Sequence, residues 1–91
     1  MMVSKKVTIL SETGLHLRPA AQFAQEACKY QSSVTFTAGD YKGSAKSVLS
    51  VLAGCVKCGD TILIECSGVD EEEALNGMCA VVAGGLGDKK E

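Results

Sequence analysis

The sequence predicts a single α+β domain, an open-faced β-sandwich in which a four-stranded antiparallel sheet is covered on one face by three helices. Three observations support this prediction. The chain has 91 residues, which is enough for one hydrophobic core and too few for a second. Its composition, 46% hydrophobic and 22% charged, is typical of a globular protein. Its apolar residues alternate in some segments and recur at helical spacing in others, in the order β-α-β-β-α-β-α.

The first half of the chain predicts a strand, a helix and a β-hairpin. Residues 7–10 form a short apolar run that ends at a polar turn, which indicates a first strand. Apolar residues recur at helical spacing from Pro19 to Ala27, and a proline suits the first helical turn because no helical hydrogen bond is lost there. Residues 34–38 alternate, and residues 41–45 return after a Gly-Asp turn, so these two segments are expected to pair.

The second half predicts a short helix, a strand and a longer helix. The short helix covers residues 48–52, and Gly54 is expected to follow its end in the left-handed conformation. Residues 61–66 alternate as a fourth strand should. An acidic run precedes the apolar spacing of residues 74–82, and acids in a first turn complement the helix dipole. Residues 85–91 are expected to form a frayed C-terminal tail.

The composition excludes several classes of function. Nine basic and eleven acidic residues give a net charge of −2, which does not suit binding to nucleic acid phosphates. No apolar run approaches the roughly 20 residues that a membrane-spanning helix requires, so membrane insertion is not expected. The N-terminus lacks the apolar segment of a signal peptide. We therefore expect a cytoplasmic, monomeric protein.

The chain holds five cysteines, an odd number without an export signal, and these are expected to be reduced thiols. Cys55 and Cys58 form a C-x-x-C pair that leaves a helix and enters a strand, the reverse of the usual redox arrangement. We interpret the pair as chance in a cysteine-rich chain, with redox or metal binding as the alternative. Cys28, Cys66 and Cys79 are interpreted as small core residues. Neither a metal nor a cofactor is expected.

The only histidine, His16, stands just before the first predicted helix. A histidine there could be a helix cap or a partly buried polar residue. However, the free N–H groups and positive dipole of a helix start, together with Arg18, attract an anion. A neutral imidazole beside such a cradle is a nucleophile for a phosphoryl group. Because no nucleotide-binding phosphate loop is present, the chain could accept and pass on a phosphoryl group but not draw one from ATP.

Residues 14–20, Gly-Leu-His-Leu-Arg-Pro-Ala, resemble the active-site signature of the histidine-containing phosphocarrier (HPr) family of the bacterial sugar phosphotransferase system. The resemblance covers nearly the whole chain, including its length, its element order and Lys46-Ser47. It implies that His16 is phosphorylated on Nδ1 by enzyme I, which draws the group from phosphoenolpyruvate, and passes it to the IIA domains of sugar permeases. Arg18 and the amides of the helix start would hold the phosphoryl oxygens.

Ser47 stands at the start of the second predicted helix, where serine is an ordinary N-cap. In some members of the family the matching serine is phosphorylated by a dedicated kinase, so a cap and a regulatory site are equal alternatives. The resemblance also implies a docking surface for enzyme I and the IIA domains. Leu49 is the expected exposed contact, because Val48, Leu49 and Leu52 cannot all face inward on one short helix. The expected docking residues are Leu17, Ala21, Gln25, Val48, Leu49 and Leu52, and Leu17, which replaces a smaller or polar family residue, is expected to tune partner choice.

Two other functions stay open. The protein could be a paralogue in a nitrogen-related or regulatory phosphorelay, or an adaptor that binds a transcription regulator through the docking surface without being phosphorylated. The presence of both His16 and Arg18 argues against the unphosphorylated adaptor. A carrier of this kind is a phosphoryl-transfer intermediate rather than a stand-alone enzyme, because it turns over only with its partner enzymes.

Overall fold

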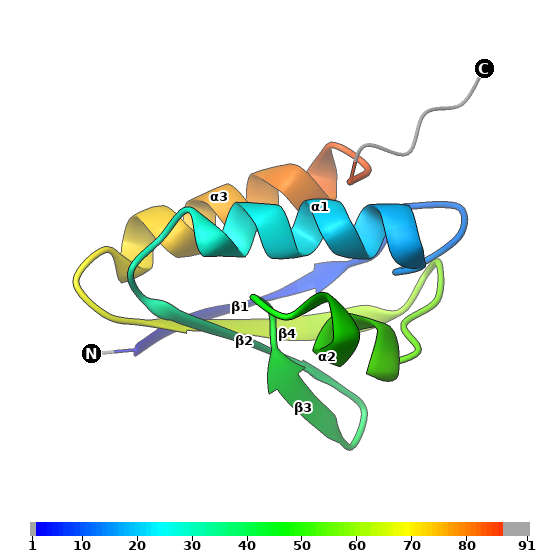
Figure 1. Ribbon diagram of the computed structural model, residues 1–91, viewed down its shortest axis with the longest axis horizontal. Coiled ribbons are helices and arrows are strands. Elements are labelled where there is room, and N and C mark those ends of the chain that lie inside the picture. The colour runs from blue at the N-terminus through cyan, green and yellow to red at the C-terminus, as the bar shows by residue number, and fades with distance from the viewer. Residues whose placement is uncertain (1, 87–91) are drawn as a thin grey trace.

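The structure is a computed structural model that describes residues 2–86, and it has the predicted element order (Figure 1). Within these residues, four strands form one antiparallel sheet in the order β1-β4-β2-β3. The elements are β1 (Met2–Thr8), α1 (Leu17–Cys28), β2 (Ser33–Ala38), β3 (Tyr41–Ser44), α2 (Val48–Ala53), β4 (Thr61–Ser67) and α3 (Glu71–Ala83). The predicted α+β class and topology are therefore confirmed.

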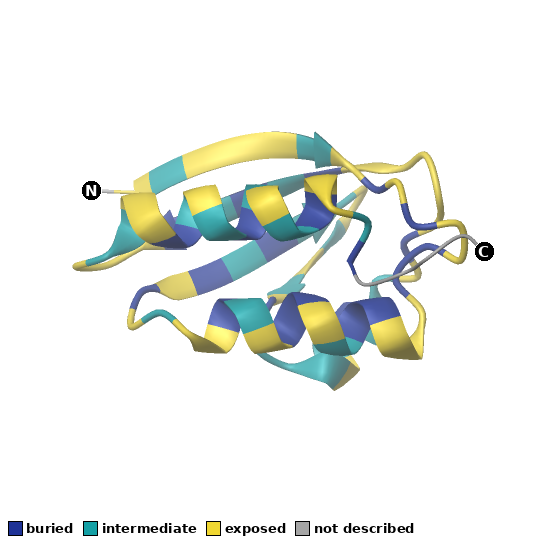
Figure 2. Cartoon of the chain, turned by 90° about the horizontal axis from the view of Figure 1, so that it is seen from above, coloured by how far each residue is buried: buried dark blue, intermediate teal, exposed yellow. Residues whose placement is uncertain are grey.

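The helices cover one face of the sheet, and the core lies between the two layers (Figures 1 and 2). Helix α3 contacts β1 and β4, α1 contacts α3 and α2, and α2 contacts β3. Ile62 and Ile64 of β4 are fully buried beneath the helices, as are Phe23 of α1 and Phe36 of β2, whose rings meet edge to face at 5.9 Å. None of the described helices has the length and hydropathy needed to cross a membrane.

The first strand begins earlier than the expected range of residues 7–10, because β1 pairs with β4 along its whole length. Alternation did not reveal it, since β1 is an edge strand and carries two adjacent charges. Lys5 and Lys6 lie on opposite faces of the sheet, opposite Ile64 and Leu63 of β4. Leu10, which was expected in the strand, lies beyond it and is exposed.

The end of α2 also differs from the prediction. Gly54 was expected in the left-handed conformation, but it has φ −71°, and Cys55 takes the left-handed conformation with φ 51°. The glycine is needed for packing instead, because a methyl group placed on it would lie 2.9 Å from the ring of Phe36. The conformational strain is thereby transferred to a cysteine.

The C-terminal tail begins later than expected. Leu86 is fully buried, and its N–H donates to the carbonyl of Val81 at 3.0 Å. The first two residues predicted as tail therefore belong to the fold, and residues 87–91 lie outside the described residues.

The cysteines predicted to be in the core behave differently from one another. Cys66 is fully buried as expected, and Cys79 is half-buried. Cys28 is exposed, so that prediction is wrong: it lies in the last turn of α1, beside the buried stripe that ends at Ala27. Its thiol donates to the carbonyl of Lys46 at 3.6 Å.

Candidate functional site

His16 is the N-cap residue of α1. Its backbone is extended, with φ −78° and ψ −172°, and its carbonyl accepts the N–H of Ala20 at 2.7 Å. The imidazole is exposed and makes no capping hydrogen bond. The backbone of His16 therefore begins the helix while its ring is left available to a ligand, and neither a side-chain cap nor a partly buried ring describes it.

The first turn of α1 places free backbone donors beside this ring. Within residues 2–86, the N–H groups of Leu17 and Arg18 have no acceptor, as is usual for the first residues of a helix. Pro19 has no N–H. The guanidinium of Arg18 is exposed and forms no ion pair with any residue that the structure describes. Two amides, the positive end of a helix dipole and one arginine thus surround an exposed imidazole, an arrangement suited to an anion.

The loop that carries His16 is held by backbone contacts to the segment after α2. Leu15 is buried, and its N–H donates to the carbonyl of Val56 at 2.9 Å. Gly14 has φ 70°, and a methyl group placed on it would lie 2.4 Å from the Val56 oxygen and 2.7 Å from Cα of Lys57. Only glycine fits this conformation and this close approach. The histidine is therefore positioned by main chain, which leaves its side chain free.

Two hollows flank His16. One is lined by Leu15, His16, Leu52, Cys55, Val56 and Lys57, and the other by Thr13, His16, Leu17, Arg18 and Pro19. The second contains His16 and Arg18, which were expected to lie together because they adjoin one another in the sequence. The contribution of residues 55–57 was missed, since it depends on a contact between segments about forty residues apart; the C-x-x-C pair was noticed, but nothing local connects it to the histidine.

Ser47 is the N-cap of α2, and its hydroxyl accepts the N–H of Ser50 at 3.2 Å. The prediction that Ser47 caps a helix is thereby confirmed. Helix α2 packs against α1. The residues expected to dock partners are all at least partly accessible: Leu17 and Leu49 are 68% and 79% exposed, Gln25 is exposed, and Ala21, Val48 and Leu52 are half-buried.

Metal ligands do not gather at this site. Across residues 2–86, no group of three or more His, Cys, Asp or Glu side chains is arranged to hold a metal ion. The chemistry available at the site is that of an imidazole nucleophile beside anion-binding groups.

Comparisons with known proteins agree with this geometry. The sequence model of the family described as "PTS HPr component phosphorylation site" matches residues 3–84. The phosphocarrier protein HPr of Haemophilus influenzae is 38% identical over 81 residues, which cover 89% of this chain and 95% of that protein. The HPr-like protein Crh of Bacillus subtilis is also 38% identical over 81 residues, with the same coverage of 89% and 95%.

The likeness extends to three dimensions. The crystal structure of HPr-C-His from Thermoanaerobacter tengcongensis matches this fold with a TM-score of 0.91 at 31% identity, and the match covers 97% of this chain and 99% of that one. Relatives of this chain thus include both HPr and Crh. Since the family match spans nearly all of the described residues and includes the loop of His16, the chain belongs to the HPr family of phosphocarrier proteins.

Proposed function

We propose that this protein carries a phosphoryl group on His16 in a sugar phosphotransferase system. An imidazole nitrogen of His16, Nδ1 by resemblance to the family, attacks the phosphorus of phosphorylated enzyme I. A new N–P bond forms as the bond between the phosphorus and its carrier atom on enzyme I breaks, and that carrier atom leaves with the bonding electron pair. The same exchange in the next step passes the group from His16 to a IIA domain. Membership of the family supports partners of these two kinds.

One observation carries this proposal: the imidazole of His16 is exposed and unbonded beside two free N–H groups at a helix start. A transferring phosphoryl group develops charge on its equatorial oxygens, and preorganised donors stabilise that charge without rearranging. The proposed donors are the N–H groups of Leu17 and Arg18, in the helix turn that follows His16, and the guanidinium of Arg18, which lines a hollow with His16. The histidine therefore stands before a helix so that the helix start can hold the group that the ring bears.

The experiment that tests the proposal is phosphorylation of purified protein by enzyme I and labelled phosphoenolpyruvate. Wild type should acquire an acid-labile label, and His16→Ala should acquire none. Thermal unfolding should be the same for both proteins within about 0.5 kcal/mol, because an exposed side chain without hydrogen bonds is removed. An acid-labile label on His16→Ala would show that the phosphoryl group is carried elsewhere.

Ser47 is proposed as a second, regulatory site of phosphorylation. It is half-exposed at the start of α2, two residues before Leu49, which is 79% exposed and belongs to the proposed docking surface. A phosphate there would suit the helix dipole while adding about two negative charges to the surface that partners contact. The relative Crh, whose solution structure is described as that of the Bacillus subtilis catabolite repression HPr, supports a regulatory role of this kind.

Ser47→Asp tests that role, because it adds one charge and retains a capping side chain. We expect slower phosphorylation of His16 by enzyme I, with unchanged or slightly raised thermal stability. Ser47→Ala is the control: it should lose about 1 kcal/mol of stability with the cap but keep the wild-type rate. Equal rates for Ser47→Asp and wild type at low ionic strength, where screening is weakest, would leave Ser47 as a cap only.

A further inference from the structure

The loop between α2 and β4 carries two exposed thiols for which phosphoryl transfer has no use, Cys55 and Cys58. They occupy different surroundings. Cys55 lines the same hollow as His16 and Leu15. Cys58 is absent from the lining of that hollow, and its sulfur lies 4.0 Å from the carbonyl oxygen of Leu10. Cys55 therefore lines the hollow of the histidine, whereas Cys58 approaches the loop of His16 through its backbone nitrogen, which would lie 3.1 Å from a methyl group placed on Gly14.

The backbone of Cys55 is held by main-chain hydrogen bonds on both sides. Its own N–H donates to the carbonyl of Leu52 at 3.1 Å, and the carbonyl of the next residue, Val56, accepts the N–H of Leu15 at 2.9 Å. Between these bonds Cys55 is held at φ 51°, a conformation that residues other than glycine rarely adopt. The bond from Leu15 to Val56 joins the loop of Cys55 directly to the loop of His16.

The remaining cysteines are unsuited to the same role. Burial raises the pKa of Cys66 to about 11 and also raises the pKa of Cys79, which disfavours the reactive thiolate in both. Cys28 is exposed, but it ends α1, whereas His16 begins it. Among the described residues, Cys55 is the one thiol that is both exposed and part of the hollow beside the histidine.

We propose that Cys55 is a modification site through which thiol–disulfide exchange switches phosphoryl transfer off; this rests on the proposed function of His16. The Cys55 thiolate attacks one sulfur of a low-molecular-weight disulfide. A disulfide bond forms to Cys55 Sγ, the original S–S bond breaks, and the released thiolate takes up the proton that Cys55 has lost. Attack by a free thiol on the mixed disulfide reverses the exchange and restores the carrier.

The attached group blocks transfer for two physical reasons. It occupies the hollow beside the imidazole, which phosphorylated enzyme I must approach closely enough to align its phosphoryl group with the reacting nitrogen of His16. A glutathionyl group also brings a net negative charge next to the ring that must receive a phosphoryl group, and like charges repel. A methylthio group is small and neutral, so it should inhibit less.

The test compares two double variants, one of which retains the Cys55 thiol and the other the Cys58 thiol. Cys28→Ser with Cys58→Ser leaves Cys55 as the exposed thiol, and Cys28→Ser with Cys55→Ser leaves Cys58. Each is treated with oxidised glutathione until mass spectrometry shows one glutathionyl group per chain, and its labelling by enzyme I and phosphoenolpyruvate is compared with its own untreated form. We expect labelling to slow at least about tenfold when Cys55 is modified and less than about twofold when Cys58 is modified. Dithiothreitol should restore the untreated rate, and modification of Cys55 by methyl methanethiosulfonate should slow labelling less.

Three results would overturn the switch: full modification of Cys55 without a change in labelling, equal inhibition through Cys58, or failure of Cys55 to react under conditions in which Cys58 does. Labelling of reduced wild-type protein distinguishes failure of the Cys55 switch from failure of the proposed function of His16. If it takes up no label, the proposed function fails and the switch fails with it. If it is labelled normally while modified Cys55 has no effect, the switch alone is wrong.

Discussion

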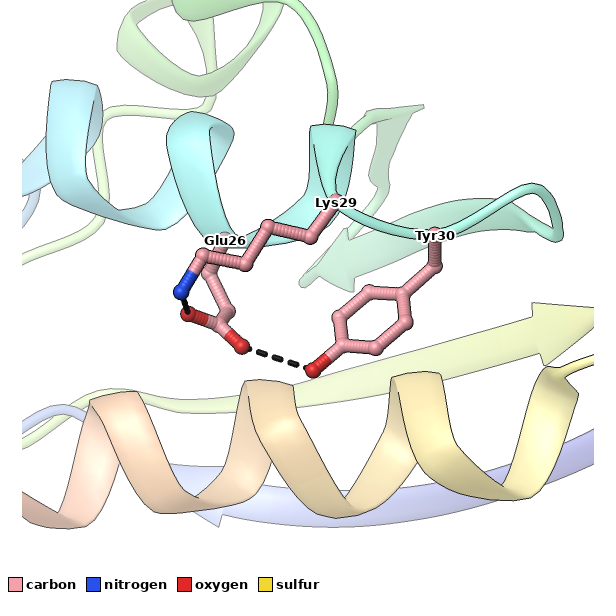
Figure 3. A network of polar contacts seen from close by, with 3 residues as sticks. All are labelled: Glu26, Lys29 and Tyr30. Carbon is pink, nitrogen blue, oxygen red and sulfur yellow. Dashed lines mark hydrogen bonds and ion pairs between the residues drawn. The ribbon is translucent and has the colours of Figure 1, made fainter.

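The two ends of helix α1 use their polar groups in opposite ways. At the C-terminal end, the carboxylate of Glu26 accepts the Tyr30 hydroxyl at 2.7 Å and pairs with Nζ of Lys29 at 2.9 Å (Figure 3). The hydrogen bond to Glu26 raises the pKa of Tyr30 to about 12. At the N-terminal end, His16 and Arg18 have no such partners among the described residues. One end of the helix satisfies its polar groups within the fold, and the other leaves them for a ligand.

The N-cap residue of α3 adds further hydrogen bonds near the C-terminal end of α1. The carboxylate of Asp70 accepts the N–H groups of Gln31 and Ser32, at 3.0 and 2.9 Å, and also the hydroxyl of Ser32. These bonds join α3 to the turn that follows α1. The proposed phosphoryl site and these stabilising contacts therefore lie at opposite ends of α1, and substitutions at the two ends should affect different measurements.

Gly14→Ala should have the largest effect, because Gly14 contributes both to the stability of the fold and to the position of the His16 loop. The alanine must adopt φ 70° and place a methyl group against the main chain of Val56 and Lys57, so we expect a loss of about 2–4 kcal/mol in unfolding free energy and a strong loss of His16 labelling. Chemical denaturation and the enzyme I assay measure the two effects. Gly39→Ala is the matched control: it has φ 61° with nothing within 4 Å of the added methyl group, so only the conformational strain of about 1 kcal/mol applies. Equal losses in both variants would show that the close approach to Val56 is unimportant.

Arg18→Ala should slow phosphoryl transfer about tenfold to a hundredfold without changing stability, because the role proposed for the guanidinium is to stabilise charge that develops during transfer. Steady-state kinetics with enzyme I should show the change in turnover. Arg18→Lys, which keeps the charge but loses the planar fork of donors, should lie between wild type and Arg18→Ala. A change confined to the Michaelis constant would instead assign Arg18 to docking.

Ser32→Ala should cost about 1–2 kcal/mol of unfolding free energy, because it removes a buried hydroxyl that donates to the carboxylate of Asp70. It should leave His16 labelling unchanged, because this contact lies beyond the C-terminal end of α1, far from His16 in the sequence. Ser33→Ala removes an exposed hydroxyl that donates to the carbonyl of Ser67 at 3.3 Å, and it should change stability by less than about 0.5 kcal/mol. Slower labelling in Ser32→Ala would show that the two ends are coupled.

The effect of Ser32→Ala should depend on pH. The Ser32 hydroxyl is the largest cause that holds the pKa of Asp70 below its ordinary value of 3.8, followed by the N–H of Gln31. A lowered pKa contributes stability that is fully present above the unfolded value and is lost as the pH falls through the folded one. The difference in unfolding free energy between wild type and Ser32→Ala should therefore be constant near neutral pH and shrink below pH 3.8.

Cys55→Gly should have the smallest effect, a gain of about 0.5–1 kcal/mol. Glycine adopts φ 51° without strain, and the gain is reduced because glycine loses more backbone entropy on folding. Thermal unfolding measures it, with Cys58→Gly as the comparison in the same loop. An equal gain from Cys58→Gly would mean that removal of a thiol, rather than relief of strain at Cys55, is responsible.

Local pattern was enough to predict the element order and that His16 and Arg18 lie together at the start of α1. His16, Arg18 and the start of α1 adjoin one another in the sequence, so their meeting required no knowledge of the fold. The bond from Leu15 to Val56 could not be predicted in this way, because it joins loops that only the folded chain brings together. The left-handed Cys55 was missed for a related reason: Gly54 is committed to its contact with Phe36, which lies on another element.

The position of β1 at the edge of the sheet has a consequence for self-association. An edge strand of seven residues presents unpaired main-chain groups to which a second copy of the chain could add. If two β1 strands paired antiparallel along their full length, Lys5 of one copy would lie directly opposite Lys5 of the other. Like charges placed directly opposite one another destabilise such a pair. Lys5, one of the two lysines that concealed this strand from the alternation pattern, thus disfavours pairing of this edge with a second copy in that register.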